Sequence, residues 1–131
     1  MASKRKGTRY ERELFHMFWS TGTWSSLRSA GSGSTPLPAP DLIASNGSKI
    51  LAIECKSIKK GIKYIEQEKI DELTEFSKKF GAEAWIAMRF DNFGWFFIKP
   101  EDLKKTKNNI PSISLKFAQK KALKFEDLTK N

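Results

Sequence analysis

Two acidic residues and a lysine in the middle of the chain have side chains suited to metal-dependent hydrolysis. Asp41 follows Pro40, and after twelve intervening residues come Glu54, Cys55 and Lys56. Hard carboxylate oxygens suit Mg²⁺, which keeps some of its waters and also binds phosphate oxygens. A water on such an ion becomes a better nucleophile, and a lysine can orient it or stabilise charge on the phosphorus oxygens. These residue types therefore indicate phosphodiester hydrolysis, provided that the fold brings them together.

A β-hairpin centred on Asn46-Gly47 would do this, because that dipeptide is typical of tight turns and apolar runs flank it. If these two residues alone form the turn, Asp41 faces Ala52 and lies diagonal to Glu54 on one face of the sheet, about 7 to 8 Å away at the backbone. Alternation places Lys56 on that face too. A three-residue turn would break this arrangement. The alternative is that Asp41 begins a strand and Glu54 forms an exposed ion pair with Lys56.

The elements that would position these residues follow the order helix, three strands, helix, two strands. This order predicts an α/β domain with a mixed sheet and helices packed against it. A Gly, Ser and Pro-rich stretch over residues 29–40 predicts a mobile loop, and the chain from Pro100 is weakly patterned. The expected helices and strands are Thr8 to about Thr21; Trp24 to Ser29, Asp41 to Ser45 and Ile50 to Ser57; Glu66 to Phe80; Ala84 to Phe90 and Trp95 to Ile98; and a short final helix around Phe125 to Thr129.

Length and composition favour one packed domain spanning residues 1–131, with a basic arm at 1–7 and a lysine-rich segment at 104–131. Ten Phe, four Trp and two Tyr exclude a disordered chain, because that much apolar surface can offset chain entropy. The single cysteine excludes a cysteine-based zinc cluster and an internal disulfide. No apolar run reaches membrane length, and the basic start lacks the apolar stretch of a signal peptide. We therefore expect a cytoplasmic protein without a membrane partner.

The positive charge is concentrated near the two ends of the chain. Residues 1–12 carry five basic and one acidic side chain, residues 99–131 carry nine lysines and four acids, and residues 13–98 balance at ten against ten. Such a distribution suits a polyanion such as nucleic acid. A lysine-rich surface that only keeps the protein soluble is the alternative.

Longer motifs place the chain near a known family. Pro40-Asp41 with Glu54-Cys55-Lys56 resembles the PD-(D/E)XK nuclease signature. Its surroundings resemble the archaeal Holliday junction resolvases of the Hjc type, in order from about Lys6 to Leu103, over about three quarters of the chain. The segments that carry this resemblance are Lys6 to Leu14, Arg28 to Ser34, Asn46-Gly47, Ala52 to Ser57 and Glu75 to Glu83.

The resemblance implies a restriction-endonuclease-like fold and a homodimeric, Mg²⁺-dependent endonuclease that nicks two opposed strands of a four-way DNA junction. Mn²⁺ is expected to substitute, and no small-molecule cofactor beyond the metal is expected. The family's functional residues fall on metal ligands Glu11, Asp41 and Glu54, on catalytic Lys56, and on loop residues Arg28 and Ser32, for which Ser34 is a near equivalent. On the first helix, Glu11 borders the buried stripe, whereas Glu13 is expected to point away.

The resemblance also assigns the remaining contacts. DNA phosphates would meet Lys4, Arg5, Lys6, Arg9, Arg12 and Arg28. Phe76 and Phe80 would lie in the dimer interface, although the helical pattern alone favours core positions for both, with Ser77 as the alternative to Phe76. The only histidine, His16, is expected to be structural.

Two other functions remain open at this point. The same metal motif serves repair and restriction-type endonucleases that act on other DNA, because a fold does not determine its substrate. A catalytically silent DNA-binding module is the second alternative. The complete set of Glu11, Asp41, Glu54 and Lys56 argues against it, because a pure binder has no need of carboxylates beside DNA phosphates.

Overall fold

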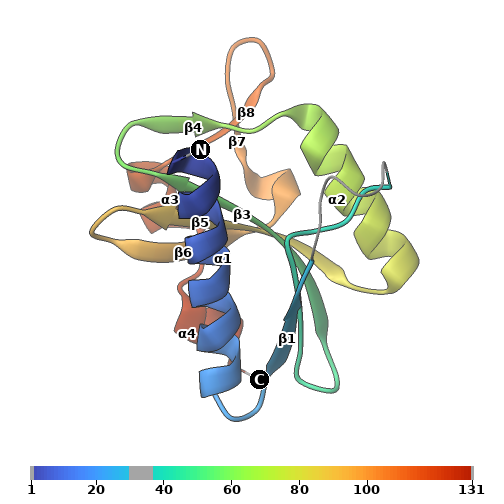
Figure 1. The fold of residues 1–131 in the computed structure, drawn as a ribbon. Helices are drawn as coiled ribbons and strands as arrows, with labels where there is room; N and C mark the ends of the chain where they lie inside the picture. Colours follow the sequence, from blue (N-terminus) through green and yellow to red (C-terminus); the bar gives the residue numbers. More distant parts are fainter. Residues whose placement is uncertain (1, 30–36, 131) are drawn as a thin grey trace.

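A five-stranded mixed sheet forms the centre of the molecule, with the strand order β1-β2-β3-β5-β6 (Figure 1). The computed structural model describes residues 2–29 and 37–130, with side chains from Gly7 onward. The central pair β3 and β5 is parallel, and the other neighbouring pairs are antiparallel. The strands are β1 (Ser25–Arg28), β2 (Leu42–Ser45), β3 (Ile50–Ile58), β5 (Glu83–Phe90) and β6 (Gly94–Ile98). The expected mixed α/β architecture is therefore confirmed.

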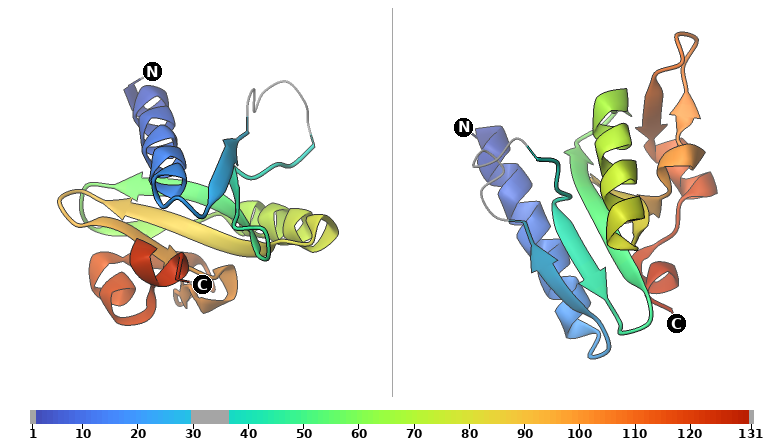
Figure 2. Two further views of the ribbon diagram at one scale, coloured as in Figure 1. Left: turned by 90° about the horizontal axis from the view of Figure 1, so that it is seen from below. Right: turned by 90° about the vertical axis from the view of Figure 1, so that its right-hand side faces the viewer.

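Helix α1 (Ala2–Ser20) lies against one face of this sheet (Figure 2), and the short helix α4 (Phe125–Leu128) packs in the same hydrophobic cluster as α1. Leu14 and Phe18 are fully buried, and the Phe18 ring meets the Phe125 ring at 5.1 Å. The predicted start of this helix at Thr8 is wrong, because the helix begins six residues earlier. Residues 2–7, expected as a basic arm, are thus part of α1.

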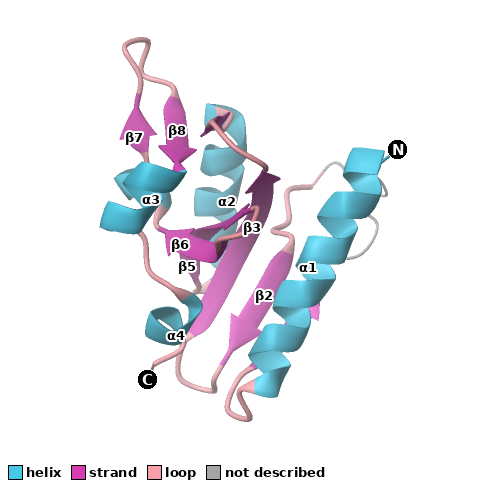
Figure 3. Ribbon diagram, turned by 90° about the vertical axis from the view of Figure 1, so that its left-hand side faces the viewer, coloured by secondary structure: helices cyan, strands magenta, loops and turns pink. Residues whose placement is uncertain are grey.

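The opposite face is covered by helices α2 (Gln67–Phe80) and α3 (Leu115–Lys121), with the 3₁₀ helix η1 (Pro100–Asp102) between β6 and β7 (Figure 3). Ile70 and Leu73 of α2 pack in one cluster with Ala52 of β3 and Met88 of β5. Gly81 ends α2 with φ of 80°, and its N–H donates to the Ser77 carbonyl. This left-handed conformation favours glycine, as the sequence suggested.

A second, three-stranded sheet with the order β4-β8-β7 was not predicted. It consists of β4 (Ile62–Tyr64), β8 (Pro111–Ser114) and β7 (Lys104–Lys105). Its strands are only two to four residues long, so they carry little hydrophobic periodicity. Pairing across some fifty residues of chain, from Lys63 to Ile113, creates this sheet.

The loop between β2 and β3 is longer than expected. Ser45 pairs with Ile50, so four residues, from Asn46 to Lys49, form the loop. The predicted pairing of Asp41 with Ala52 is wrong, because Ala52 pairs with Ile43. The Asn46 side chain accepts hydrogen bonds from the N–H groups of Ser48 and Lys49 at 2.9 and 2.8 Å. Because the register differs by two residues, every side chain keeps its predicted face.

Within residues 2–29 and 37–130, no helix has the length and apolar character needed to cross a bilayer.

Candidate active site

Strands β2 and β3 bring Asp41 and Glu54 together. The pairing of Ile43 with Ala52, continued by two residues, sets Asp41 opposite Glu54 rather than diagonal to it. The Cys55 N–H donates to Asp41 Oδ2 at 2.8 Å, which attaches this carboxylate to β3. Both acids are half-buried. Cross-strand neighbours have Cβ atoms about 4.5 to 5.5 Å apart, closer than the predicted diagonal.

Glu11 approaches these two acids from α1. Burial raises the pKa of Glu11, and the Asp41 carboxylate raises it further, whereas a hydrogen bond from Arg28 lowers it. The Arg28 guanidinium, at the end of β1, lies 3.4 Å from Glu11 Oε1. Helix α1 and three strands thus supply one cluster of charged side chains.

Burial opposes ionisation of all three carboxylates in this cluster, although Arg28, Lys56 and Lys69 lie near them. Burial raises the pKa of Glu54 to about 7, and Asp41 and Glu11 act in the same direction, against Lys56 and Lys69. Burial likewise raises the pKa of Asp41, against the Cys55 hydrogen bond and Lys56. Keeping three carboxylates ionised here is therefore unfavourable unless a further cation is bound.

The carboxylates have protein partners in this structure. Lys56 Nζ lies 3.8 Å from Glu54 Oε2. The sequence suggested this ion pair as an alternative to a metal site, but as an exposed pair, whereas both side chains are largely buried. As the described residues are placed here, no three His, Cys, Asp or Glu side chains are already arranged as the ligands of a metal ion. The carboxylate oxygens of Glu11, Asp41 and Glu54 are the kind of ligand that a hard divalent cation prefers. Burial raises the pKa of each of the three side chains, and a bound cation would favour their ionised forms.

Arg28 has one hydrogen-bond donor that no described residue accepts. Its Nε is buried and has no hydrogen-bond partner among the described residues, while its terminal nitrogen binds Glu11. An unsatisfied buried donor is costly, and an anionic ligand would satisfy it. Ser32 and Ser34 lie outside the described residues, as do the side chains of Lys4, Arg5 and Lys6. Arg9 and Arg12 lie exposed on α1, on either side of Tyr10 and Glu11.

Two predicted orientations are wrong. Glu13 does not point away: its Oε1 accepts from Arg89 Nε at 2.9 Å and from Trp95 Nε1 at 2.7 Å, because β5 and β6 extend beneath this side of α1. Phe80 is not a core residue, because its side chain is 52% exposed and stacks on Phe76 at 5.1 Å. Of the alternatives Phe76 and Ser77, it is Ser77 that takes the buried position on α2.

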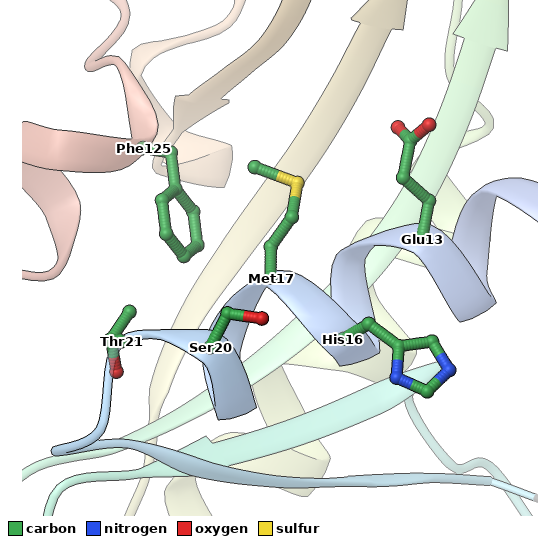
Figure 4. Close-up of a pocket in the computed structure, with 6 residues that line it drawn as sticks. All are labelled: Glu13, His16, Met17, Ser20, Thr21 and Phe125. Atoms are coloured by element: carbon green, nitrogen blue, oxygen red, sulfur yellow. The ribbon is translucent and has the colours of Figure 1, made fainter.

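Two hollows lie outside the acidic cluster. One, of about 350 Å³, is lined by Leu37, Pro38, Glu75, Phe76, Lys79 and Phe80. The other, of about 450 Å³, lies between α1 and α4 and contains none of the predicted catalytic residues (Figure 4). Its lining is Glu13, His16, Met17, Ser20, Thr21 and Phe125. The His16 ring meets Phe15 edge-on at 5.0 Å.

Lys69 is a member of the cluster that sequence reasoning missed. It lies in the first turn of α2, next to buried Ile70, and its charge opposes the rise in the pKa of both Asp41 and Glu54. Its position next to Ile70 could have revealed Lys69, because Ile70 belongs to the apolar stripe with which α2 packs on the sheet face that carries Glu54.

Comparison with known proteins gives a consistent result. A family model described as archaeal Holliday junction resolvase (Hjc) matches residues 2–131. The crossover junction endodeoxyribonuclease Hjc of Archaeoglobus fulgidus is 40% identical over 106 residues, covering 81% of this chain and 77% of that protein. The Hjc of Methanocaldococcus jannaschii is 35% identical, covering 95% and 96% of the two chains.

A solved structure agrees with these matches. The structure of Archaeoglobus fulgidus Hjc, described as a Holliday junction resolvase from an archaeal hyperthermophile, superimposes with a TM-score of 0.84 at 32% identity, covering 93% of this chain and 98% of that one. The chain therefore belongs to the archaeal Holliday junction resolvase family, and its fold is the restriction-endonuclease-like fold expected from the sequence.

Proposed function

We propose that this chain is a structure-selective endonuclease that resolves four-way DNA junctions by metal-dependent phosphodiester hydrolysis. The observation that carries the proposal is the position of Asp41 opposite Glu54, with Lys56 beside them, in a member of this family. Relatives named crossover junction endodeoxyribonuclease support the same activity here.

Glu11, Asp41 and Glu54 would hold Mg²⁺, for which Mn²⁺ would substitute. The ion would supply an activated water and neutralise charge on a phosphate oxygen. The mutual influence of the three carboxylates on their pKa values supports this assignment, because a bound divalent cation would relieve their repulsion.

The chain's own cations would act on the phosphate. Lys56 Nζ, held near Glu54, would orient the attacking water or contact a non-bridging oxygen. Arg28 would bind a phosphate oxygen through Nε, the donor that lacks a partner among the described residues. Lys4, Arg5, Lys6, Arg9 and Arg12, all on α1, would contact the flanking backbone of the DNA. Ser32 would assist from its loop.

A homodimer is part of the proposal, because cutting a junction symmetrically needs two active sites related by a two-fold axis. The stacked pair Phe76 and Phe80 supports an interface on α2, since a large ring that is half exposed gains free energy when a partner covers it. The hollow beside these rings, next to Leu37 and Pro38, would receive side chains of the second copy.

The test compares a synthetic four-way junction with a linear duplex of the same sequence, each with Mg²⁺ and with EDTA. We expect paired nicks in the junction that require Mg²⁺, and much slower cutting of the duplex. Equal cutting of both substrates would indicate a repair or restriction-type nuclease. Binding without cutting at any Mg²⁺ concentration would indicate a silent DNA-binding module.

A further inference from the structure

The small sheet β4-β8-β7 and its adjoining turns carry six of the chain's 24 basic residues. Residues 59–64 and 104–114 contain six lysines and no acidic residue, against a formal net charge of +9 for the whole chain. These lysines are Lys59, Lys60, Lys63, Lys104, Lys105 and Lys107. We call residues 59–64 and 104–114 the basic sheet. A surface that serves solubility normally mixes both signs of charge, and this one does not.

The register of the strands determines which side chains face outward. Ile113 points into the core, so Tyr64 and Lys104, which pair with the neighbouring residue Ser112, lie on the opposite face. Ser112 itself is buried between them, whereas Tyr64 and Lys104 are exposed. Tyr64 is 57% exposed, and Ile62, on the same face of β4, is 51% exposed. The outer face therefore combines an aromatic ring and an aliphatic side chain with lysine.

The lysines of the basic sheet have no acidic partners. None of the six forms an ion pair with a residue in the described part of the chain. Five of them are exposed, and Lys63 is half-buried. Their charge is consequently available to a polyanion, and such a field attracts one from solution.

The basic sheet continues directly from the acidic cluster. Strand β3 carries Glu54 and Lys56, ends at Ile58, and turns through Lys59 and Lys60 into β4. At about 3.3 Å per residue, Lys60 is within about 13 Å of Lys56 along the chain. A duplex of that length carries roughly eight phosphate charges, so one DNA arm could contact both places. Figure 1 shows β4, β7 and β8 at the same end of the molecule as the start of α1.

We propose that the basic sheet is a second DNA-contact surface, which binds the phosphate backbone of a duplex arm next to the cleaved strand. Tyr64 and Ile62 pack against the sugars of that arm between the phosphate contacts. This inference rests on the proposed function, because it assigns the surface to the same DNA substrate.

The experiment measures equilibrium binding of the intact protein to a four-way junction and to a linear duplex in EDTA, across a series of salt concentrations. The test variant is Lys60→Gln with Lys104→Gln. The matched control is Lys49→Gln with Lys130→Gln, which also lowers the formal charge by two. Lys49 lies in the β2–β3 loop and Lys130 near the C-terminus, both at the other end of the molecule (Figure 1).

We expect the test variant to bind several-fold more weakly, with a slope of log K against log salt about 2 smaller than that of the wild type, because each lost phosphate contact removes about 0.9. The control should keep the wild-type slope, and Lys60→Arg with Lys104→Arg should restore it. Thermal unfolding would verify that all variants are folded. If the double variant were unfolded, Lys104→Gln alone would replace it, with an expected salt slope about 1 smaller than that of the wild type.

An unchanged slope in the test variant, or an equal loss in the control, would overturn the inference. This outcome is distinct from failure of the proposed function. If the wild type bound junction and duplex equally and cut neither, the proposed function would fail, while the slopes measured on duplex would still decide the role of the basic sheet.

Discussion

At the residue scale, the acidic cluster contains groups whose burial is unfavourable for the stability of the folded chain. Asp41, directly before β2, lies next to Glu54 of β3, and burial raises the pKa of both. Arg28 keeps a buried donor without a partner among the described residues. Unfavourable groups of this kind concentrate at functional sites. The buried Cys55 thiol has a pKa well above its ordinary value, so it is no candidate nucleophile.

The carboxylates can be tested by removing one negative charge at a time. We expect Asp41→Asn and Glu54→Gln each to reduce junction cleavage in Mg²⁺ by at least about a hundredfold, as removal of a strongly stabilising group does. Junction affinity in EDTA should persist, because the basic surfaces remain. Single-turnover cleavage and binding assays would measure the two effects. A variant that cut at the wild-type rate would remove that residue from the metal site.

The raised pKa of Glu54 also predicts how stability depends on pH. Between the ordinary value of 4.5 and about 7, the folded protein binds more protons than the unfolded chain. The free energy of unfolding therefore falls as pH rises through this interval, by up to about 3 kcal/mol at 1.36 kcal/mol per pH unit. Glu54→Gln should remove this contribution, so in EDTA the variant should be more stable than the wild type at pH 8 and similar below pH 4.5.

Urea unfolding of the two proteins from pH 4 to pH 8 would measure the difference. Parallel curves over the whole range would show that the pKa of Glu54 is not raised. Addition of Mg²⁺ at pH 8 should stabilise the wild type more than the variant, because only the wild type keeps all three carboxylates.

At the element scale, the β2–β3 hairpin determines whether the acidic side chains meet. A change of register by one residue would move Asp41 to the other face of the sheet. The Asn46 side chain holds the four-residue loop through its two backbone hydrogen bonds, and Gly47 adopts φ of 95°. The loop is therefore ordered by specific contacts and not only by its length.

Replacing Asn46 with alanine tests this role. We expect a loss of about 1 kcal/mol in the free energy of unfolding, because alanine cannot accept the hydrogen bonds from the Ser48 and Lys49 N–H groups. Ser48→Ala is the matched control, since Ser48 contributes its backbone N–H and not its side chain to these bonds. Chemical denaturation would give both values. Equal effects of the two substitutions would contradict the role of Asn46.

At the scale of the whole molecule, the proposed activity needs two copies of the chain. A dimer would carry a formal charge of +18, twice that of one chain, and would present two acidic clusters to one junction. The exposed Phe80 ring, stacked on Phe76, is the strongest candidate for the contact between copies.

Phe80→Glu should weaken this contact, because each subunit would bury an unpaired charge in an apolar interface. Sedimentation should show a mass near 15.0 kDa for the variant and twice that for the wild type. Since Phe80 is exposed within one subunit, the fold should survive. Phe93→Glu, at the exposed β5–β6 turn, is the control. A variant that stayed dimeric would place the interface elsewhere.

The sequence by itself determined which residues could form the acidic site and which helices and central strands carry them. Alternation along β2 and β3 places Asp41, Glu54 and Lys56 on one face whether the loop has two residues or four, because both lengths preserve parity. The apolar stripes of α1 and α2 are equally local signals. The structure has these predicted features because each depends only on residues that are close together in the chain.

Only the tertiary structure decided the contacts between distant segments. It brought Glu11 to Arg28, turned Glu13 toward Arg89, left Phe80 exposed, and joined two lysine-rich segments into the basic sheet. No local periodicity encodes such contacts, because they depend on how elements pack across the sheet.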